Sequence, residues 1–321
     1  MNSRIFHLAS ALALSSILLV AVGCAGSRRA DLHQTLRQNE ARTPNGEPEV
    51  LAAYQPWFGR PGHINVGYSS QDPAVLARQV AEAKDLGISG FVVNWYGPSH
   101  AFEDRAYSLL QDVAAGNDFA VAILYDENSD DPGHTTDDAI NDLNYAHDHY
   151  IAAGASARAY LRYNGRPVIF IFPKDGHTDW QRVRQAVNTW ADPPLLLYKD
   201  VDPRLVGDFD GFYAWVHPGR GGWAADGSNW GQSYLEHFYS EMTSQYPDKL
   251  AVGAAWPGFD DRRASWSRNR LMSARCGKTF ADSLHLFRRY YNDQRPLPFL
   301  LIVTWNDYEE GTAIERGTGK C

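Results

Sequence analysis

The sequence predicts an α/β protein, a (β/α)₈ barrel, and three observations lead to that prediction. Short apolar runs recur eight times along the chain. Amphipathic helical patterns separate most of these runs, and such alternation of strand and helix favours a parallel sheet. The length of 321 residues accommodates one barrel domain of about 250 residues. An open, doubly wound sheet built from the same elements is the alternative.

The eight apolar runs are continuous rather than alternating, which is typical of parallel strands that are covered on both faces. We predict strands at Val50–Tyr54, Gly90–Asn94, Ala120–Leu124, Pro167–Ile171, Pro194–Tyr198, Gly211–Trp215, Leu250–Ala254 and Phe299–Val303.

Six segments between the runs show the spacing of apolar residues that amphipathic helices require. They lie at Pro73–Leu86, Phe102–Ala115, Thr136–Ala152, Trp180–Trp190, Ser233–Ser244 and Lys278–Asn292. We expect Asp179 and Ser233 to be helix N-caps and Gly87 to end a helix, because these residue types are favoured at those positions.

Two features depart from a complete barrel. Only a short segment around residues 202–206 separates the fifth and sixth strands, so we expect a reduced or missing fifth helix. The sequence ends at Cys321, soon after the eighth strand, which leaves no room for a final helix. We expect either that an N-terminal tether fills the gap or that the barrel is partly open there.

The first residues resemble a lipoprotein signal peptide. Arg4 precedes an apolar run over residues 5–22, which ends in Ala-Val-Gly before Cys24. A charged region, an apolar region and a small residue before the cut describe a secretory signal. The last four residues resemble the lipobox of bacterial lipoproteins, which implies cleavage before Cys24 and acylation of its thiol. The alternative, an uncleaved anchor, is disfavoured because the run barely reaches the roughly 18–20 residues of a membrane span.

This interpretation predicts both the domain organisation and the location of the protein. Residues 1–23 are the signal peptide, residues 24–49 are a polar tether without apolar periodicity, and residues 50–321 are the barrel. We expect a monomer in the bacterial cell envelope, at the outer membrane or the cell surface, held to the membrane only through its lipid.

Composition limits the partners and cofactors. The net charge is −8, and no basic run interleaved with aromatic residues is present, which argues against a nucleic-acid partner. No CxxC or His-x-x-x-His spacing occurs, so we expect no metal site and no cofactor. If Cys24 carries lipid, Cys276 and Cys321 remain, an even number in an exported protein. We therefore expect a disulfide between them.

Aromatic residues, carboxylates and amides follow the predicted strands, where barrel enzymes place their chemistry. Aromatic residues occur at six of the eight strand ends. The faces of sugar rings pack on aromatic rings, and sugar hydroxyls need donors and acceptors, so we predict a sugar-binding site. Core packing is the alternative for any single ring. The candidate substrate-binding residues are Tyr54, Trp57, Asn94, Trp95, Tyr96, Asp126, Glu127, Tyr213, Trp215, Trp256, Trp305 and Asn306.

Two carboxyl groups just past the last predicted strand are the catalytic candidates. Asp307 and Glu310 lie three residues apart in the segment TWNDYEEGTAIE. Glycosidic cleavage usually requires one carboxyl group that donates a proton and a second that activates the nucleophile. An acidic surface loop would show the same spacing, so the spacing alone does not decide between the two.

That segment resembles the terminal-strand motif of family 99 glycoside hydrolases, in which an Asn, a carboxylate, an aromatic residue, any residue, Glu, Gly and Thr follow one another. It also resembles the TWND motif of family 71, the α-1,3-glucanases. Four further segments resemble family 99: YQPWFG from Tyr54, NWYG from Asn94, FDGFYAWVHP over residues 209–218 and PGFDDRRASWSRNR over residues 257–270. The resemblance therefore spans nearly all of the chain from Tyr54 onward.

The resemblance implies an endo-acting, metal-independent glycosidase that acts on an α-linked polysaccharide, either α-mannan-like or an α-glucan. Glu310 matches the family's general acid. Asp307 matches a second carboxylate, which in family 99 is a Glu that deprotonates the 2-hydroxyl of the sugar with net retention, and in family 71 is an Asp in an inverting scheme. Asp126 matches a substrate-binding Glu of family 99, with Glu127 as a close competitor.

We expect retention, because the resemblance to family 99 covers more of the chain. A carbohydrate-binding envelope lipoprotein without catalysis is the main alternative on the same barrel, and a structural envelope protein is a more distant one.

Overall fold

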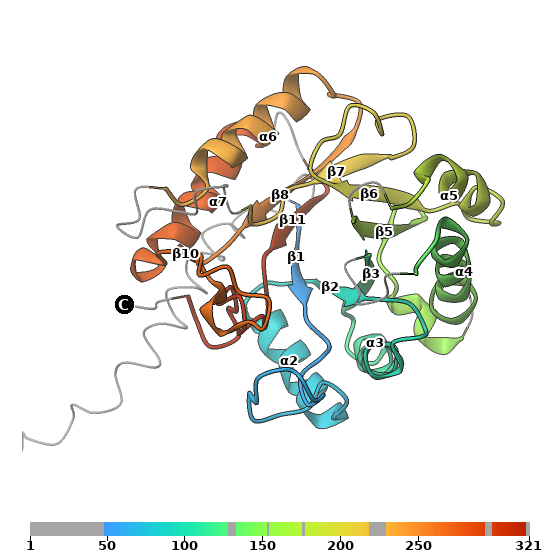
Figure 1. The fold of residues 1–321 in the computed structure, drawn as a ribbon, viewed down its shortest axis with the longest axis horizontal. Helices are drawn as coiled ribbons and strands as arrows, with labels where there is room; N and C mark the ends of the chain where they lie inside the picture. Colours follow the sequence, from blue (N-terminus) through green and yellow to red (C-terminus); the bar gives the residue numbers. More distant parts are fainter. Residues whose placement is uncertain are drawn as a thin grey trace, which may run out of the picture.

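Eight parallel strands form the centre of the molecule, and the predicted barrel is confirmed (Figure 1). The computed structural model describes residues 48–127, 133–152, 154–174, 177–217, 229–292 and 297–318. The barrel strands are β1 (Glu49–Tyr54), β2 (Gly90–Trp95), β3 (Ala120–Asp126), β5 (Arg166–Phe172), β6 (Leu195–Lys199), β7 (Gly211–Tyr213), β8 (Leu250–Ala255) and β11 (Phe299–Ile302). Each coincides with one predicted strand.

The barrel closes, which excludes the open sheet. β1 pairs in parallel with both β2 and β11, and β3 pairs in parallel with β5, so that every barrel strand has two neighbours. The pairing of β1 with β11 also excludes a barrel that is partly open after the last strand. The alternative filler of that gap is the tether at residues 24–49. Its residues 24–47 lie outside the described residues, and Glu49 belongs to β1.

Helices surround the strands (Figure 1). They are α2 (Pro73–Asp85), α3 (Ala101–Ala115), α4 (Thr136–Ala146) with a π-helical turn at His147–Ile151, α5 (Trp180–Val187), α6 (Gln232–Ser244) and α7 (Lys278–Tyr290). Shorter elements are 3₁₀ turns at Ala155–Ala159, Asp261–Arg263 and Arg275–Gly277, strand β4 (Arg162–Tyr163) against β5, and the hairpin β9 (Phe259–Asp260) and β10 (Leu271–Met272).

The predicted helix ends are confirmed at two positions and wrong at one. The Asp179 side chain accepts a hydrogen bond from the Arg182 amide at the start of α5, and Gly87 follows α2 with a φ of 81°. Ser233 is not an N-cap, because α6 begins at Gln232 and its cap is Gly231, with a φ of 88°. A Cβ at Gly231 would lie 2.7 Å from the ring of Trp256, so close packing as well as backbone conformation favours glycine there.

Both predicted departures from a complete barrel are confirmed. Turns rather than a helix connect β6 to β7, and no helix follows β11 in the residues described up to 318. The segment after β11 instead folds back onto the end of the strand, where the Ile314 amide donates to the carbonyl oxygens of Thr304 and Trp305 at 3.2 and 3.0 Å. Among the described residues, no helix combines the length and apolar character that a bilayer crossing needs.

The strand pairing between β7 and β8 generates a stability prediction. Gly211 lies opposite Leu250, and a Cβ at 211 would lie 2.6 and 2.8 Å from the Cβ and carbonyl carbon of Leu250. Gly211→Ala must therefore separate two central strands. We expect a loss of about 1–3 kcal/mol of unfolding free energy, measured by chemical denaturation.

Gly207→Ala is the matched control, because a Cβ there meets no atom within 4 Å. We expect that control to keep wild-type stability. Equal stability of the two variants would show that β7 and β8 do not pair as closely as described.

Candidate functional site

A cavity of about 930 Å³ opens at the carboxyl ends of the barrel strands. Its wall combines aromatic rings, carboxylates and basic groups from the loops after most of the barrel strands. The lining residues are Gln55, Trp57, Arg60, His63, Asn94, Tyr96, His100, Glu103, Asp126, Phe172, Pro173, Tyr198, Lys199, Asp200, Val201, Asp202, Pro203, Arg204, Trp215, Trp266, Arg268, Arg270, Asp307 and Glu310. Its size and its mixed apolar and polar lining are typical of a ligand-binding pocket.

Asp307 is held rigidly at the base of this cavity. Its backbone amide donates to Thr304 Oγ1 at 2.8 Å. Its Oδ1 accepts from the amides of Glu309 and Glu310 at 3.0 and 2.8 Å. These bonds form a tight turn immediately after β11, and they orient a carboxyl group that is 2% exposed.

Glu310 lies one turn further along and reaches the cavity from the side. The Trp266 indole N–H donates to Glu310 Oε1 at 3.0 Å, and the Glu310 carbonyl accepts from the Asp260 amide at 2.7 Å. The intervening Glu309 turns away, because its carboxylate bonds to His63 Nδ1 at 2.8 Å and accepts from the Ile64 amide at 3.2 Å. The spacing of three residues therefore brings Asp307 and Glu310 to the same cavity.

Electrostatics favours protonation of both groups. Burial raises the pKa of Asp307 well above its ordinary value, and the charges of Glu310 and Glu309 raise it further, against the two backbone amides. Burial also raises the pKa of Glu310, while the Trp266 indole and the charges of Arg270 and Lys199 oppose the shift. Two such neighbouring groups titrate as a pair, so one of the two carboxyl groups can keep its proton while the other is ionised.

A third carboxyl group, Asp126, is fixed at the end of β3. Asn94 Nδ2 donates to Asp126 Oδ2 at 3.0 Å. The neighbouring Tyr96 also lines the cavity, and burial together with the Asp126 charge raises the pKa of its phenol well above its ordinary value. Tyr96 therefore stays a neutral hydroxyl that can donate as well as accept.

Aromatic rings form two parts of the cavity wall. Trp57 stacks on His63 with ring centroids 4.9 Å apart, and the Trp266 ring meets Trp57 edge-on at 6.2 Å. Phe172 and Trp215 form a second edge-on pair at 5.3 Å. Such faces are suited to the C–H surfaces of sugar rings.

Of the residues predicted from the sequence, the structure brings seven together in the cavity wall: Trp57, Asn94, Tyr96, Asp126, Trp215, Asp307 and Glu310. Their roles remain predictions.

Four predicted substrate contacts point out of the barrel, which corrects those predictions. Successive strand residues face opposite sides, so Trp95 lies on the opposite side of β2 from Asn94, and its indole N–H donates to Asp104 Oδ1 at 3.0 Å. The Tyr54 hydroxyl donates to Gln79 on α2 at 2.9 Å. Trp305 is buried against Phe91. Glu127 accepts from the Lys174 amide at 3.2 Å and lines no part of the cavity, so Asp126 rather than Glu127 faces it.

Three further predicted substrate contacts are corrected, because their side chains hydrogen-bond to backbone groups of the protein and do not line the cavity. The Tyr213 hydroxyl donates to the Ile171 carbonyl at 3.0 Å beneath the cavity. The Trp256 indole N–H donates to the Trp230 carbonyl at 3.0 Å. Asn306 accepts from the Gln55 amide at 2.7 Å and donates to its carbonyl at 2.9 Å, which joins the loops after β1 and β11.

The sequence interpretation missed most of the charged wall. The segment from Lys199 to Arg204 follows β6, where turns replace a helix before β7, and it lines the cavity. Its sequence, Lys-Asp-Val-Asp-Pro-Arg, could have indicated a functional loop. Trp266 and Arg270 belong to the loop between β9 and β10, where Asp261 anchors Arg270 through its side chain at 2.7 Å. In the sequence, residues 257–270 stand out only through their resemblance to family 99, which singles out neither Trp266 nor Arg270.

Cys276 is disulfide-bonded. Its predicted partner, Cys321, lies outside the described residues, so that pairing stays a prediction. Cys24 also lies outside them.

Comparisons with known proteins identify relatives of the chain. The family model described as glycosyl hydrolase family 71 matches residues 64–316. A glycoprotein endo-alpha-1,2-mannosidase-like protein of Danio rerio is 23% identical over 296 residues, which cover 86% of this chain but only 62% of that protein. The corresponding protein of Mus musculus is 22% identical, with 92% and 68% covered.

Solved structures share the fold. The GH99 endo-alpha-mannosidase of Bacteroides thetaiotaomicron superimposes with a TM-score of 0.63 at 20% identity, over 83% of this chain and 87% of that chain. Its complex with bis-tris propane gives a TM-score of 0.65 at 19% identity, with 83% and 86% covered.

Burial of Asp307 generates a prediction about stability and pH. The folded-state pKa of Asp307 is raised above the unfolded value of about 3.9, so the folded protein loses stability as pH rises from the unfolded value through the folded one. Asp307→Asn removes that cost and keeps an acceptor for both amides. We expect a gain of about 0.5–2 kcal/mol at pH 7.5 and a smaller gain at pH 4.5, measured by denaturant unfolding.

The control is Asp248→Asn, at an exposed carboxyl group, for which we expect no change at either pH. A loss of stability in Asp307→Asn at pH 7.5, or an equal gain at both pH values, would contradict the raised pKa.

Proposed function

The chain belongs to glycosyl hydrolase family 71, and we propose that this glycosidase cleaves internal α-linkages of a polysaccharide with Asp307 and Glu310 as its catalytic carboxyl groups. We place an α-mannan-like chain first among the substrates, because the curated relatives are named endo-alpha-1,2-mannosidase-like proteins. An α-glucan is second, because the TWND motif resembles that of the α-1,3-glucanases.

One observation carries the proposal: two carboxyl groups with raised pKa values lie on one turn at the base of a cavity with aromatic walls. A glycosidase needs one group that is still protonated near neutral pH and one that is ionised. An acidic surface loop has neither the burial nor the hydrogen bonds that orient Asp307, so the spacing seen in the sequence gains support from the geometry.

The roles within the pair are assigned as follows. Glu310, which matches the family's acid, donates a proton to the leaving oxygen. Its Trp266 hydrogen bond holds one oxygen and leaves Oε2 for the substrate. Asp307, fixed by two amides that favour its ionised form, acts as the base. The attacking water gives a proton to Asp307, its oxygen bonds to the anomeric carbon, and the leaving oxygen takes the proton of Glu310.

The reaction is proposed to invert the anomeric centre. The sequence expectation was retention, based on the wider resemblance to family 99. The family 71 match now covers residues 64–316, and the carboxylate at position 307 is the Asp of the inverting scheme. NMR of the first-formed anomer distinguishes the two outcomes.

The function is tested with three glycans and two variants. Wild-type protein is incubated with α-mannan, α-1,3-glucan and α-1,6-linked glucan, and new reducing ends are measured. We expect Glu310→Gln to lose about 10²–10⁴-fold on the cleaved glycan and to lose far less on aryl glycosides, whose leaving groups need little protonation. Asp307→Asn should lose activity on both, because activation of the nucleophile needs a carboxylate.

Glu236→Gln on α6, outside the cavity wall, is the control and should keep wild-type rates. Near wild-type rates in both catalytic variants would refute the assignment of the pair. Retardation in glycan-containing gels without new reducing ends would favour the carbohydrate-binding alternative.

We also infer that the protein is exported and anchored through lipid on Cys24. The charged, apolar and small-residue order of residues 1–24 supports this, and the disulfide at Cys276 suits an exported protein. In a bacterial host labelled with radioactive palmitate, the wild-type chain should incorporate label and enter the detergent phase. Cys24→Ser should do neither, whereas equal labelling of both proteins would exclude this anchor.

A further inference from the structure

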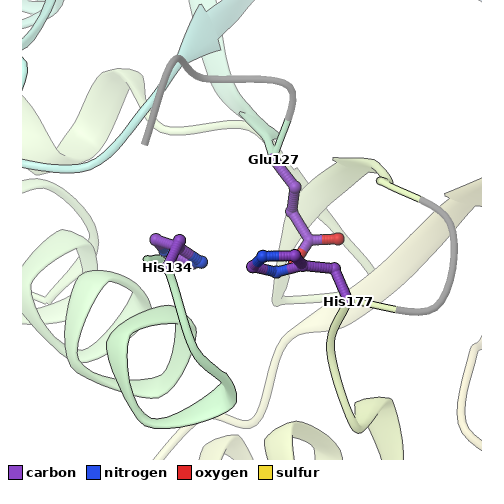
Figure 2. Close-up of side chains that lie close together, drawn as sticks. All are labelled: Glu127, His134 and His177. Carbon is purple, nitrogen blue, oxygen red and sulfur yellow. The ribbon is translucent and has the colours of Figure 1, made fainter. Parts of the chain in front are cut away.

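Three metal-ligating side chains meet outside the cavity. Glu127, His134 and His177 each place one possible ligand atom within 4.8 Å of the other two. Figure 2 shows the carboxylate and the two imidazole rings turned toward one another. None of the three lines the cavity, so the glycosidase site does not account for this cluster.

The fold explains why residues from three segments converge here. Glu127 directly follows β3, His134 precedes α4, and His177 lies between β5 and α5 (Figure 2). Because β3 and β5 are neighbours in the barrel, the loops after them lie side by side, and the Glu127 amide donates to the Phe172 carbonyl at 3.0 Å. The barrel therefore places Glu127 beside the end of β5, which leads to His177.

The hydrogen bonds around the two histidines leave ring nitrogens available. His134 Nε2 lies 2.8 Å from the Tyr125 hydroxyl and 3.4 Å from Asp142 Oδ2. The Nδ1 atoms of His134 and His177 are buried and have no hydrogen-bond partner among the described residues. A buried polar atom without a partner is costly. A carboxylate or hydroxyl that orients one ring nitrogen is the usual support of a metal-binding histidine.

Glu127 supplies the negative charge. It is 3% exposed, and hydrogen bonds from Thr178 Oγ1 and the Lys174 amide hold its carboxylate in place. A bound cation would offset the cost of a buried carboxylate.

We infer that Glu127, His134 and His177 bind a divalent transition-metal ion, with Zn²⁺ the best match to two imidazoles and one carboxylate. Water completes a four-coordinate site. Zinc bonds of about 2.0–2.2 Å need ligand atoms closer than those in the structure, so the side chains draw together on binding. The ion joins the loops after β3 and β5, and its role is structural because none of its three ligands lines the cavity.

This site was not expected from the sequence. The three ligands are far apart along the chain and form no short motif, so only the adjacency of β3 and β5 brings them together. The inference does not depend on the proposed glycosidase function, and none of its tests uses enzyme activity.

The test measures metal binding directly. The chain is prepared without a histidine tag, stripped with chelator and dialysed against Zn²⁺, and the bound metal is counted by elemental analysis. We expect about one Zn²⁺ per chain. At a Zn²⁺ concentration about 100-fold above its dissociation constant, the unfolding midpoint should rise by roughly 5–10 °C. Co²⁺ should give the visible absorption of a four-coordinate site.

Two variants locate the binding. His177→Ala removes a ligand whose Nδ1 has no hydrogen-bond partner among the described residues, and His177→Gln keeps its bulk and polarity. Both variants should weaken Zn²⁺ binding at least 10-fold and abolish the shift in midpoint. His237→Ala is the control, because that side chain is 78% exposed on α6, and it should bind as the wild type does. Wild-type protein that takes up no Zn²⁺, or His177 variants that bind it as tightly as wild type, would overturn the inference.

Discussion

The closure of the barrel between β1 and β11 is the constraint on which the site depends. No helix follows β11 in the residues described up to 318, so hydrogen bonds rather than helix packing hold the terminal segment. The Trp305 amide donates to the Ala53 carbonyl at 2.7 Å, and Asn306 bonds to both backbone groups of Gln55. Asp307 and Glu310 follow directly, so the pairing that closes the barrel also sets the position of both carboxyl groups.

Burial in that position gives the carboxyl pair its chemistry. Burial raises the pKa of both groups, while two amides hold Asp307 Oδ1 and the Trp266 indole holds Glu310 Oε1. Successive residues at the end of a strand face opposite sides, so residues that line the cavity alternate with residues that do not. Asp126 faces the cavity, whereas Glu127, the next residue, faces the loops before α4 and α5, where the inferred metal ion would bind.

Much of the fold and part of the site could be predicted from the sequence. The eight strands follow from continuous apolar runs, and the reduced fifth helix follows from a connection too short to contain one. Asp307 and Glu310 were found through a motif. Tyr54, Trp95 and Trp305 were misassigned, because a strand end shows which residues are near the opening but not which side each faces. Arg270 and the Glu127–His134–His177 cluster depend on contacts between distant segments, which no local pattern encodes.

The central claim is that at least one of Asp307 and Glu310 keeps its proton at pH values where exposed carboxyl groups are ionised. Titration of the side-chain carboxyl groups by ¹³C NMR tests it most directly, with Asp307→Asn and Glu310→Gln to assign the signals. The account predicts a coupled pair, with one proton released well above the ordinary carboxyl value of about 4. Two independent titrations near that value would contradict it.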